Sequence, residues 1–296
     1  MSGSMAPGAL FAIATLIWGS TWLAITSQLG PVAPEASVVY RFALAALLLA
    51  GWCIATGRSL RFPLRQHAWF AAQGTFLFGL NYVCVYQAEL YVASGLVAAL
   101  FSLIVFLNIL GVRIFFATPI TRRTLVAAML GVSGVMLLFW RDFGSSHGNT
   151  LRGVAFTLGG TVFGAAGNLL AVRNQRHGVP LLPGVAWGMT YGAAAIALIA
   201  TLEGTVWTFD VRLRYVASLL YLAVFGSVIA FAAYLTLLGR IGAARAGYVG
   251  VAVPIVALLL STVFEHYVWT LPALVGATLC VIGNVLVLMP VRPTRI

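Results

Sequence analysis

Leu77-Phe78-Gly79 begins a long apolar stretch, and 147 residues later Val224-Phe225-Gly226 begins another of the same kind. Three further pairs of segments recur at offsets of 145 to 149 residues: Trp18-Gly19-Ser20 with Phe163-Gly164-Ala165, Ser94-Gly95-Leu96-Val97-Ala98-Ala99 with Ile241-Gly242-Ala243-Ala244-Arg245-Ala246, and Gly134-Val135-Met136-Leu137-Leu138 with Gly283-Asn284-Val285-Leu286-Val287. Small loop insertions explain the drift of a few residues between these offsets. The sequence therefore predicts a duplicated chain, with one half over residues 1–145 and the other over residues 146–296.

The composition indicates a membrane protein. A soluble domain carries about 25% charged residues, whereas this chain is 8% charged and 61% hydrophobic. Each of ten apolar runs is close to the roughly 20 residues that an α-helix needs to cross about 30 Å of hydrocarbon. The runs cover residues 7–29, 34–56, 67–90, 94–116, 121–140, 151–175, 181–202, 213–238, 242–264 and 270–290. Their apolar residues do not alternate with polar ones as in a membrane barrel, so we expect an all-α protein with ten transmembrane helices.

The net charge of +11 comes from 17 arginines with no lysine, and almost all of them lie at the ends of the runs. This distribution fits the positive-inside rule rather than a nucleic-acid surface. With a cytoplasmic N-terminus, the inner loops and tail hold Arg58, Arg61, Arg65, Arg113, Arg122, Arg123, Arg173, Arg176, Arg240, Arg245, Arg292 and Arg295, and the outer loops hold Arg141, Arg152, Arg212 and Arg214. Twelve arginines against four predict that both termini are cytoplasmic. Only Arg41 lies deep inside a run, away from both of its ends.

Five spans in each half is an odd number, so the second half must be inserted upside-down relative to the first. Inverted repeats of this kind build secondary transporters, with the substrate site between the halves. The sequence shows no metal cluster, nucleophile–base pair or phosphate loop, and its four histidines are scattered at span ends: His67, His147, His177 and His266. We therefore expect a transporter with no cofactor and no metal, rather than an enzyme or a passive scaffold.

Several motifs resemble the drug/metabolite transporter superfamily, and the ten-helix EamA-like branch is the closest match. The resemblance rests on Trp18-Gly19-Ser20-Thr21, on Tyr40-Arg41-Phe42-Ala43-Leu44-Ala45, on tight turns around Gly95 and Gly242, and on Glu265 at the end of the ninth span. Within that branch the chain resembles the YddG-type exporters of aromatic amino acids. The resemblance implies two five-helix halves, with spans one, three, four, six, eight and nine around a central cavity. It also implies export by alternating access at the cell inner membrane.

The chain departs from this family in its fourth span. Relatives often carry a proline within that span and an acidic residue at its end, where this sequence has Asn108 and then Thr118-Pro119. A gating role is therefore carried over to Pro254 and Glu265 in the second half and not to their first-half counterparts.

Aromatic and amide side chains are the candidates for substrate binding. Phe78, Tyr82 and Tyr86 recur every four residues, so they share one helical face, with Asn81 beside them. The full set is Trp18, Phe78, Asn81, Tyr82, Tyr86, Phe101, Asn108, Phe163, Asn168, Tyr234 and Tyr248. Such residues also occur as packing or lipid-facing groups. Stacking rings and amides without a fixed charge suit a planar, net-neutral solute.

Ionisable groups inside the spans are few and costly to bury. Arg41, Glu89 and Glu265, with Glu35, lie toward the outer side and predict either a structural ion pair or an outer gate. The first span has no acidic residue, which favours a facilitator over a proton antiporter. We expect an exporter of neutral, aromatic amino acids and related metabolites; the alternative is an exporter of drugs, nucleosides or other small metabolites, with proton coupling. The partners are the lipid bilayer and a small-molecule substrate, and the oligomeric state stays open, with a monomer compatible.

Overall fold

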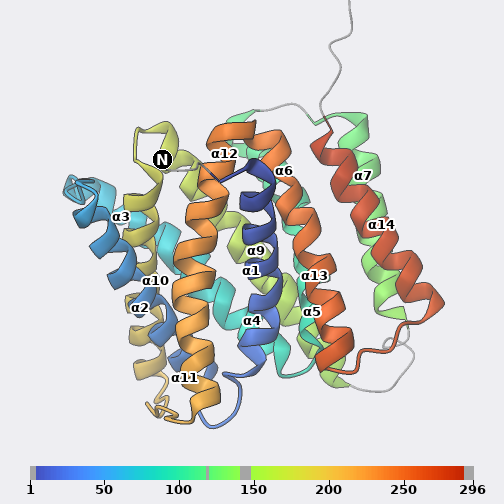
Figure 1. Cartoon of the computed structure of the whole chain (residues 1–296), viewed down its shortest axis with the longest axis horizontal. Helices are drawn as coiled ribbons and strands as arrows, with labels where there is room; N and C mark the ends of the chain where they lie inside the picture. The colour runs from blue at the N-terminus through green and yellow to red at the C-terminus, as the bar shows by residue number, and fades with distance from the viewer. Residues whose placement is uncertain (1–4, 118–119, 141–147, 290–296) are drawn as a thin grey trace, which may run out of the picture.

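The computed structural model describes residues 5–117, 120–140 and 148–289, and all regular secondary structure in them is helical (Figure 1). The helices form ten columns: α1 (Pro7–Thr26), α2 (Pro34–Ala55), α3–η1–α4 (Leu64–Gly74, Thr75–Leu80, Asn81–Glu89), α5–α6 (Ser94–Phe101, Ile104–Phe116), α7 (Arg122–Leu138), α9 (Gly148–Arg176), α10 (Leu181–Leu202), α11–η2–α12 (Leu213–Leu220, Tyr221–Ile229, Ala230–Ala246), α13 (Tyr248–Phe264) and α14 (Leu271–Leu288). The segments η1 and η2 are π-helical.

Seven columns are long and apolar enough to cross a membrane. Two more, α13 and α14, are shorter apolar helices, and α7 has 17 residues. Large apolar side chains face outward on this bundle; Leu47 of α2 is 72% exposed and Leu198 of α10 is 62% exposed. An apolar exterior of this kind is suited to lipid, which agrees with the predicted all-helical membrane protein.

Local sequence explains where several columns begin. Proline stands in the first turn of α1, α2 and α14, where its missing N–H costs no hydrogen bond. The hydroxyl of Thr121 accepts a hydrogen bond from the Thr124 amide at the start of α7. At the start of α14, Thr270 caps the Ala273 amide in the same way. Two helices that occupy equivalent places in the two halves thus share one capping device.

One predicted boundary is wrong. The sequence predicts a break between residues 238 and 242, with a tight turn around Gly242, but α12 continues to Ala246 and the break falls at Gly247. Ala243, Ala244 and Ala246 are strong helix formers, and they carry the helix past Gly242. The proposed counterpart at Gly95 lies in the first turn of α5, so these two segments are not equivalent turns.

The two halves pack on one another in a reciprocal way. Column α1 packs against α12 and α13, and α9 packs against α4 and against α5–α6. Likewise α10 lies on η1 while α2 lies on η2. The two π-helices fall at the repeated Leu77-Phe78-Gly79 and Val224-Phe225-Gly226 motifs. A motif repeated in sequence therefore produces the same rare local structure twice.

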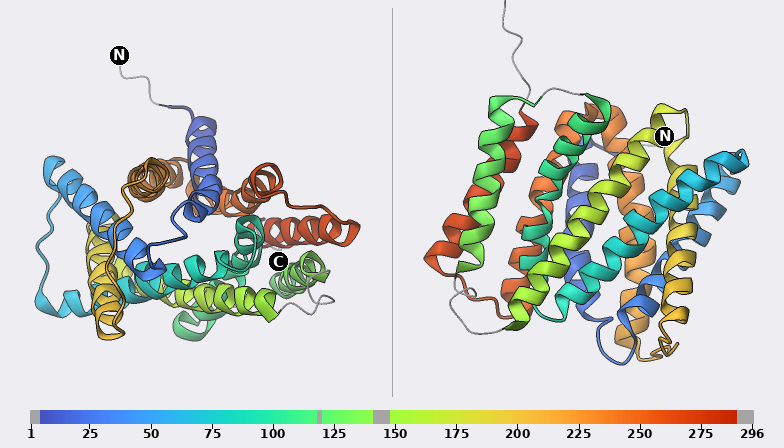
Figure 2. Two further views of the ribbon diagram at one scale, coloured as in Figure 1. Left: turned by 90° about the horizontal axis from the view of Figure 1, so that it is seen from below. Right: turned by 180° about the vertical axis from the view of Figure 1, so that it is seen from behind.

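Columns α7 and α14 form an antiparallel pair at one edge of the bundle (Figure 2). A Cβ atom added at Gly134 would lie 2.6 Å from the carbonyl oxygen of Gly276, and one added at Gly283 would lie 2.6 Å from that of Ala127. Between these contacts the thiol of Cys280 donates to the Gly131 carbonyl at 3.5 Å. Small residues thus bring the two backbones together, as is usual for helix pairs in membranes.

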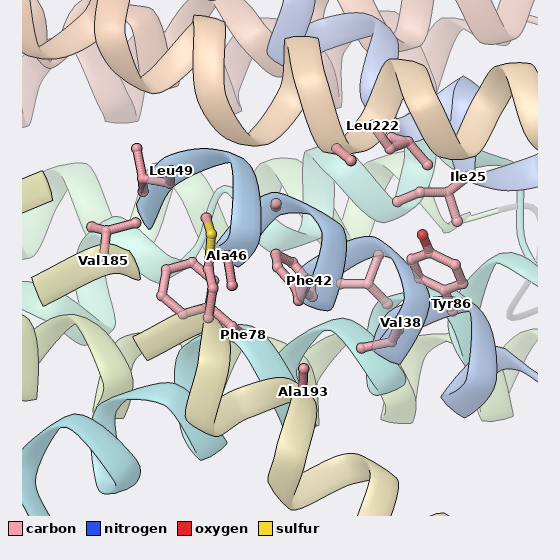
Figure 3. Packing of buried hydrophobic residues seen from close by; sticks show 14 of the residues in the cluster. Ile25, Val38, Phe42, Ala46, Leu49, Phe78, Tyr86, Val185, Ala193 and Leu222 are labelled. Atoms are coloured by element: carbon pink, nitrogen blue, oxygen red, sulfur yellow. The ribbon is translucent and has the colours of Figure 1, made fainter. Parts of the chain in front are cut away.

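The largest buried cluster joins α2, η1, α10 and η2 (Figure 3). Phe42 lies 5.4 Å from Phe78 between ring centroids, and Met189 and Leu222 pack into the same cluster. Gly74 makes the approach of α3 to α10 possible, because a Cβ there would lie 2.1 Å from the Gly188 carbonyl oxygen. This cluster fixes the position of the third column.

Candidate functional site

A cavity of about 340 Å³ lies among the columns α1, α3–η1–α4, α5–α6, α9, α11–η2–α12 and α13. These six columns correspond to the first, third, fourth, sixth, eighth and ninth apolar runs of the sequence. The cavity is lined by Trp18, Thr21, Trp22, Ile25, Leu77, Phe78, Asn81, Tyr82, Val85, Ala98, Phe101, Ser102, Ile104, Val105, Asn168, Phe231, Gly250, Val253 and Pro254. Most of these side chains are apolar or aromatic, and none is acidic or basic.

Glycines on α9 set the position of the third column in the wall. A Cβ atom at Gly160 would lie 3.1 Å from the Asn81 carbonyl oxygen, and one at Gly167 would lie 2.5 Å from the Leu77 Cβ. At Gly164 an added Cβ would meet Ile104 at 2.9 Å. These glycines form one face of α9, and they let η1 and α4 approach closely enough to carry Leu77 and Asn81 into the wall.

Aromatic rings hold one another in place around the cavity. The indole Nε1–H of Trp18 donates to the Gly226 carbonyl in η2 at 3.0 Å. The same indole lies edge-on to Phe231, with 5.1 Å between ring centroids. The ring centroids of Trp22 and Phe101 lie 5.5 Å apart. Rings at these distances stabilise one another by about 0.5–1.5 kcal/mol per pair beyond the area that they bury.

Three polar features interrupt the apolar wall. Asn81 donates through Nδ2 to the Leu77 carbonyl at 3.1 Å, while its buried Oδ1 has no hydrogen-bond partner among the described residues. The amide of Asn168 donates to Asn108 Oδ1 at 3.4 Å. Pro254 lacks the N–H that would normally bond the Gly250 carbonyl, and both residues line the cavity. Asn81 Oδ1 is buried toward Gly160 of α9 rather than open to the cavity, so the acceptor that the wall offers is the Gly250 carbonyl, which lacks its usual helical donor.

Comparison with known proteins identifies the family. The pattern of the EamA-like transporter family matches residues 6–140 and again residues 151–289. The chain belongs to the EamA-like transporter family. The same family pattern thus matches two successive segments of the chain. The sequence-based assignment to the drug/metabolite transporter superfamily is confirmed.

Several curated relatives of this EamA-like transporter match along most of their length. The "uncharacterized inner membrane transporter YedA" of Escherichia coli K12 is 29% identical over 261 residues, which cover 86% of this chain and 81% of that protein. An "uncharacterized transporter" of Archaeoglobus fulgidus is 23% identical over 279 residues, which cover 93% of this chain and 95% of that protein. A solved crystal structure has the same fold, with a TM-score of 0.66, 19% identity, and coverage of 95% of this chain and 96% of that one. The family and its relatives are transporters and not enzymes.

Seven of the residues predicted from the sequence line the cavity of this EamA-like transporter: Trp18, Phe78, Asn81, Tyr82, Phe101, Asn168 and Pro254. Two others contact lining residues, because Asn108 bonds Asn168 and the Tyr234 ring lies 5.2 Å from that of Trp18. Tyr248 is half-buried at the start of α13 and does not line the cavity.

Tyr86 and Phe163 lie outside the cavity wall. Tyr86 shares a helix face with Tyr82 but is fully buried, and its hydroxyl donates to Gln28 Oε1 at 2.9 Å. Phe163 packs 6.0 Å from the Phe76 ring, because the neighbouring Gly164 occupies the face of α9 that points inward. Sequence reasoning centred on aromatic and amide residues, so it missed the small and aliphatic part of the wall, such as Ala98 and Val253.

The predicted ion pair of Arg41 with a nearby carboxylate is absent among the described residues. Glu35 accepts a hydrogen bond from Gln87 Nε2 at 3.0 Å. Glu265 caps the start of α5 by accepting from the Ser94 amide at 3.1 Å and from its hydroxyl at 2.6 Å. Glu89 is buried, and neither carboxylate oxygen has a partner within the described ranges. Each acidic group therefore has an environment of its own, and none lies within ion-pair distance of Arg41, although Glu89 interacts with it electrostatically at longer range.

Most of the described arginines lie at one end of the bundle and the described acidic residues at the other, where Arg152, Arg212 and Arg214 also lie. Figure 1 shows the Pro7 end of α1 and the Leu288 end of α14 at one end, which we call the proximal end. The described arginines near the proximal end are Arg58, Arg61, Arg65, Arg113, Arg122, Arg123, Arg173, Arg176 and Arg240, whereas Glu35, Glu89, Glu203, Asp210 and Glu265 lie toward the opposite, distal end. In the distal loop, hydrogen bonds from Arg212 lower the pKa of Asp210. No group of three or more potential metal ligands occurs in the residues searched.

Proposed function

We propose that this protein exports neutral, aromatic amino acids and related metabolites across the cell inner membrane, by alternating access and as a facilitator. The observation that carries the proposal is the cavity of about 340 Å³, which is lined by Trp18, Trp22, Phe78 and Tyr82. Ligand sites are commonly apolar clefts of about 300–1,000 Å³ with a few polar groups. This cavity lies at the lower end of that range, which fits a small metabolite.

Stacking is the main attraction that the cavity offers to a planar side chain. Each aromatic pair contributes about 0.5–1.5 kcal/mol beyond area burial, and the rings of Trp18 and Tyr82 come from different columns. The ammonium group of an amino acid can donate a hydrogen bond to the Gly250 carbonyl. No lining residue carries a charge that titrates, which favours a facilitator over a proton antiporter.

Alternating access is supported by the arrangement of the two halves. The family pattern matches once in each half, and the packing of α1 on α12 and α13 reciprocates that of α9 on α4 and α5–α6. We therefore propose ten transmembrane helices in two inverted repeats, residues 1–145 and 146–296. In such repeats the cavity opens to either side as one half moves against the other.

The direction in the membrane follows from charge. Arginines gather at the proximal end and acidic residues at the distal end, so the positive-inside rule puts the proximal end in the cytoplasm. Both termini are then cytoplasmic. The relative YedA is named an inner membrane transporter, and its name states no substrate.

Counterflow in proteoliposomes tests the proposal. Vesicles preloaded with unlabelled phenylalanine, tyrosine or tryptophan should take up the labelled amino acid saturably, with or without a pH gradient. Uptake that needs the gradient would reject the facilitator. An apolar cavity also fits drugs and nucleosides, so exchange of these with no exchange of any amino acid would replace the proposed substrate by that alternative.

A further inference from the structure

Arg65 and Arg173 are two cations that lie close together at the proximal end of the bundle. Arg65 stands in the first turn of α3 and Arg173 in the last turn of α9, and these two helices pack against one another. The charge of Arg65 acts on the Arg173 guanidinium. Like charges repel one another, so this arrangement favours an anion bound beside both of them.

No described carboxylate supplies that anion. Neither arginine forms an ion pair with another described residue, and the described acidic residues lie toward the distal end. Glu89, in the same column as Arg65, follows it by 24 residues, which is about 36 Å along the helix axis. Salt screens exposed charges from one another beyond about 8 Å at physiological ionic strength. The compensating charge therefore comes from another molecule.

The Arg173 guanidinium is held in one position. Its central carbon lies 3.8 Å from the centroid of the Trp69 ring, a cation–π contact, and Nη1 donates to Asn174 Oδ1 at 3.1 Å. Asn174 is 2% exposed; it also accepts from Gln66 Nε2 at 3.0 Å and donates to Gln73 Oε1 at 2.7 Å. A cation fixed by a buried amide network loses little freedom when it binds a ligand.

The other donors of the pair are open. Arg65 is exposed and Arg173 is half-buried, and apart from the bond to Asn174 no hydrogen bond joins either guanidinium to a described residue. Trp69 follows Arg65 by four residues, so the two share one face of α3. Guanidinium groups bind phosphate oxygens through paired N–H donors. Two of them on one side of the α3–α9 contact suit a phosphate group.

The position of this pair along the bundle indicates a lipid as the source of the phosphate. Indole rings such as that of Trp69 are enriched at the level of the lipid headgroups. Leu64, next to Arg65, is 87% exposed, so apolar surface that is suited to acyl chains adjoins the cations. Basic sites between transmembrane helices on the cytoplasmic side of a membrane bind anionic headgroups.

We infer that Arg65, Trp69 and Arg173 form a binding site for the headgroup phosphate of an anionic phospholipid. The two guanidinium groups bind the phosphate oxygens, and Leu64 contacts the first part of the acyl chains. The orientation proposed above puts the site in the cytoplasmic leaflet, and only in this respect does the inference rest on the proposed function.

The test measures the binding of single lipids to the purified protein in a neutral detergent, from the ligand-induced rise in melting temperature. A neutral micelle lacks the anionic surface by which a bilayer attracts any nearby arginine. The probes are dioleoylphosphatidylglycerol, the zwitterionic dioleoylphosphatidylcholine with the same acyl chains, and inorganic phosphate. The variants are Arg65→Gln and Arg173→Gln. Arg122→Gln is the matched control, because Arg122 is exposed at the same end but in the first turn of α7.

We expect the wild type and Arg122→Gln to bind phosphatidylglycerol at least about 10-fold more tightly than phosphatidylcholine, the difference that one charge-assisted hydrogen bond makes. Arg65→Gln and Arg173→Gln should each lose about 10-fold or more for phosphatidylglycerol and nothing for phosphatidylcholine. Where Arg173→Gln does not fold, Arg65→Gln decides the matter, because Arg65 is exposed and ties no other described residue in place.

Three results would overturn the inference. One is equal affinity of the wild type for the two lipids, and another is a loss in Arg122→Gln as large as that in Arg65→Gln. Stabilisation by inorganic phosphate alone that matches phosphatidylglycerol would replace the lipid by a soluble anion. Failure of the proposed function looks different: in that case the lipid binds as expected while proteoliposomes exchange no amino acid.

Discussion

The contact between α7 and α14 provides a sharp test of how the two halves meet. A Cβ atom added at Gly276 would lie 2.4 Å from the carbonyl oxygen of Gly134 and 2.7 Å from the amide nitrogen of Leu138. Both neighbours are backbone atoms, which cannot rotate away as a side chain does. Gly276→Ala therefore requires the helices to part by about 1 Å to restore a contact distance of about 3.5 Å.

Two opposing effects set the change in stability that Gly276→Ala causes. Overpacking of a tight contact costs about 1–3 kcal/mol, while alanine stabilises a helix interior by about 0.5–1 kcal/mol relative to glycine. Gly51→Ala isolates the second effect, because Gly51 lies inside α2 and its added Cβ meets nothing within 4 Å. The difference between the two variants should thus be about 1–3 kcal/mol.

Thermal unfolding of the purified variants in one detergent measures this difference. Gly283→Ala should cost a similar amount, since its Cβ would lie 2.6 Å from the Ala127 carbonyl oxygen at the other end of the same contact. Combining Gly134→Ala with Gly276→Ala should cost less than the sum, because one separation of the helices relieves both clashes. Melting of Gly276→Ala at or above the temperature of Gly51→Ala would refute the close packing of α7 on α14.

Three further predictions concern the cavity, the distal end and the orientation. Trp18→Phe removes the indole N–H that donates to Gly226 and should lower stability by about 0.5–1.5 kcal/mol, measured by thermal unfolding. Glu265→Gln weakens the cap on Ser94 at the start of α5 and should cost about 1–2 kcal/mol in the same assay. A cysteine introduced at Ser59 should stay unlabelled by a membrane-impermeant maleimide in intact cells, because this exposed loop lies at the proximal end.

Each of these has a matched control. Trp22 also lines the cavity, and no hydrogen bond ties its indole to another described residue, so Trp22→Phe should leave stability closer to that of the wild type. Glu203 is exposed, and Glu203→Gln should leave the melting temperature unchanged. Val206→Cys, 73% exposed before substitution at the distal end, should be labelled in intact cells. The reverse labelling pattern at residues 59 and 206 would show that the protein is inserted the other way round.

The sequence predicted the helical columns well because their length and apolarity are local properties. Nine of the ten predicted runs begin within about three residues of a column, a margin that is usual for helix ends. The ninth run failed at Gly242, since the following alanines prolong α12 and only the packing of α13 decides where the chain turns. Helix propensity alone does not locate such a break.

The cavity was predictable only in part. Rings and amides are visible in the sequence, and Trp18 and Asn81 were found in this way. Phe163 was expected in the cavity wall but lies outside it, because the direction of its side chain depends on which face of α9 carries the glycines. The sequence also did not show that Arg41 has no ion-pair partner among the described residues, because a carboxylate near it in sequence, Glu35, accepts a hydrogen bond from Gln87 instead. Contacts between columns decide both outcomes.

The two halves are unequal at the cavity, and this bears on the transport cycle proposed above. Trp18 and Phe163 occupy repeated positions, but only Trp18 has an N–H that can bond a π-helix, here through the Gly226 carbonyl. At the counterpart of Gly226, the position Gly79 packs against Ile196 and the Gly192 carbonyl. In the inverted-repeat arrangement proposed above, the two orientations of the transporter exchange the environments of the two halves. A bond available to one half alone therefore stabilises one orientation over the other, by about the 0.5–1.5 kcal/mol of a single hydrogen bond. This corresponds to a roughly 2- to 13-fold bias between the two states. Trp18→Phe should remove the bias and bring the populations accessible from the two sides closer to equality.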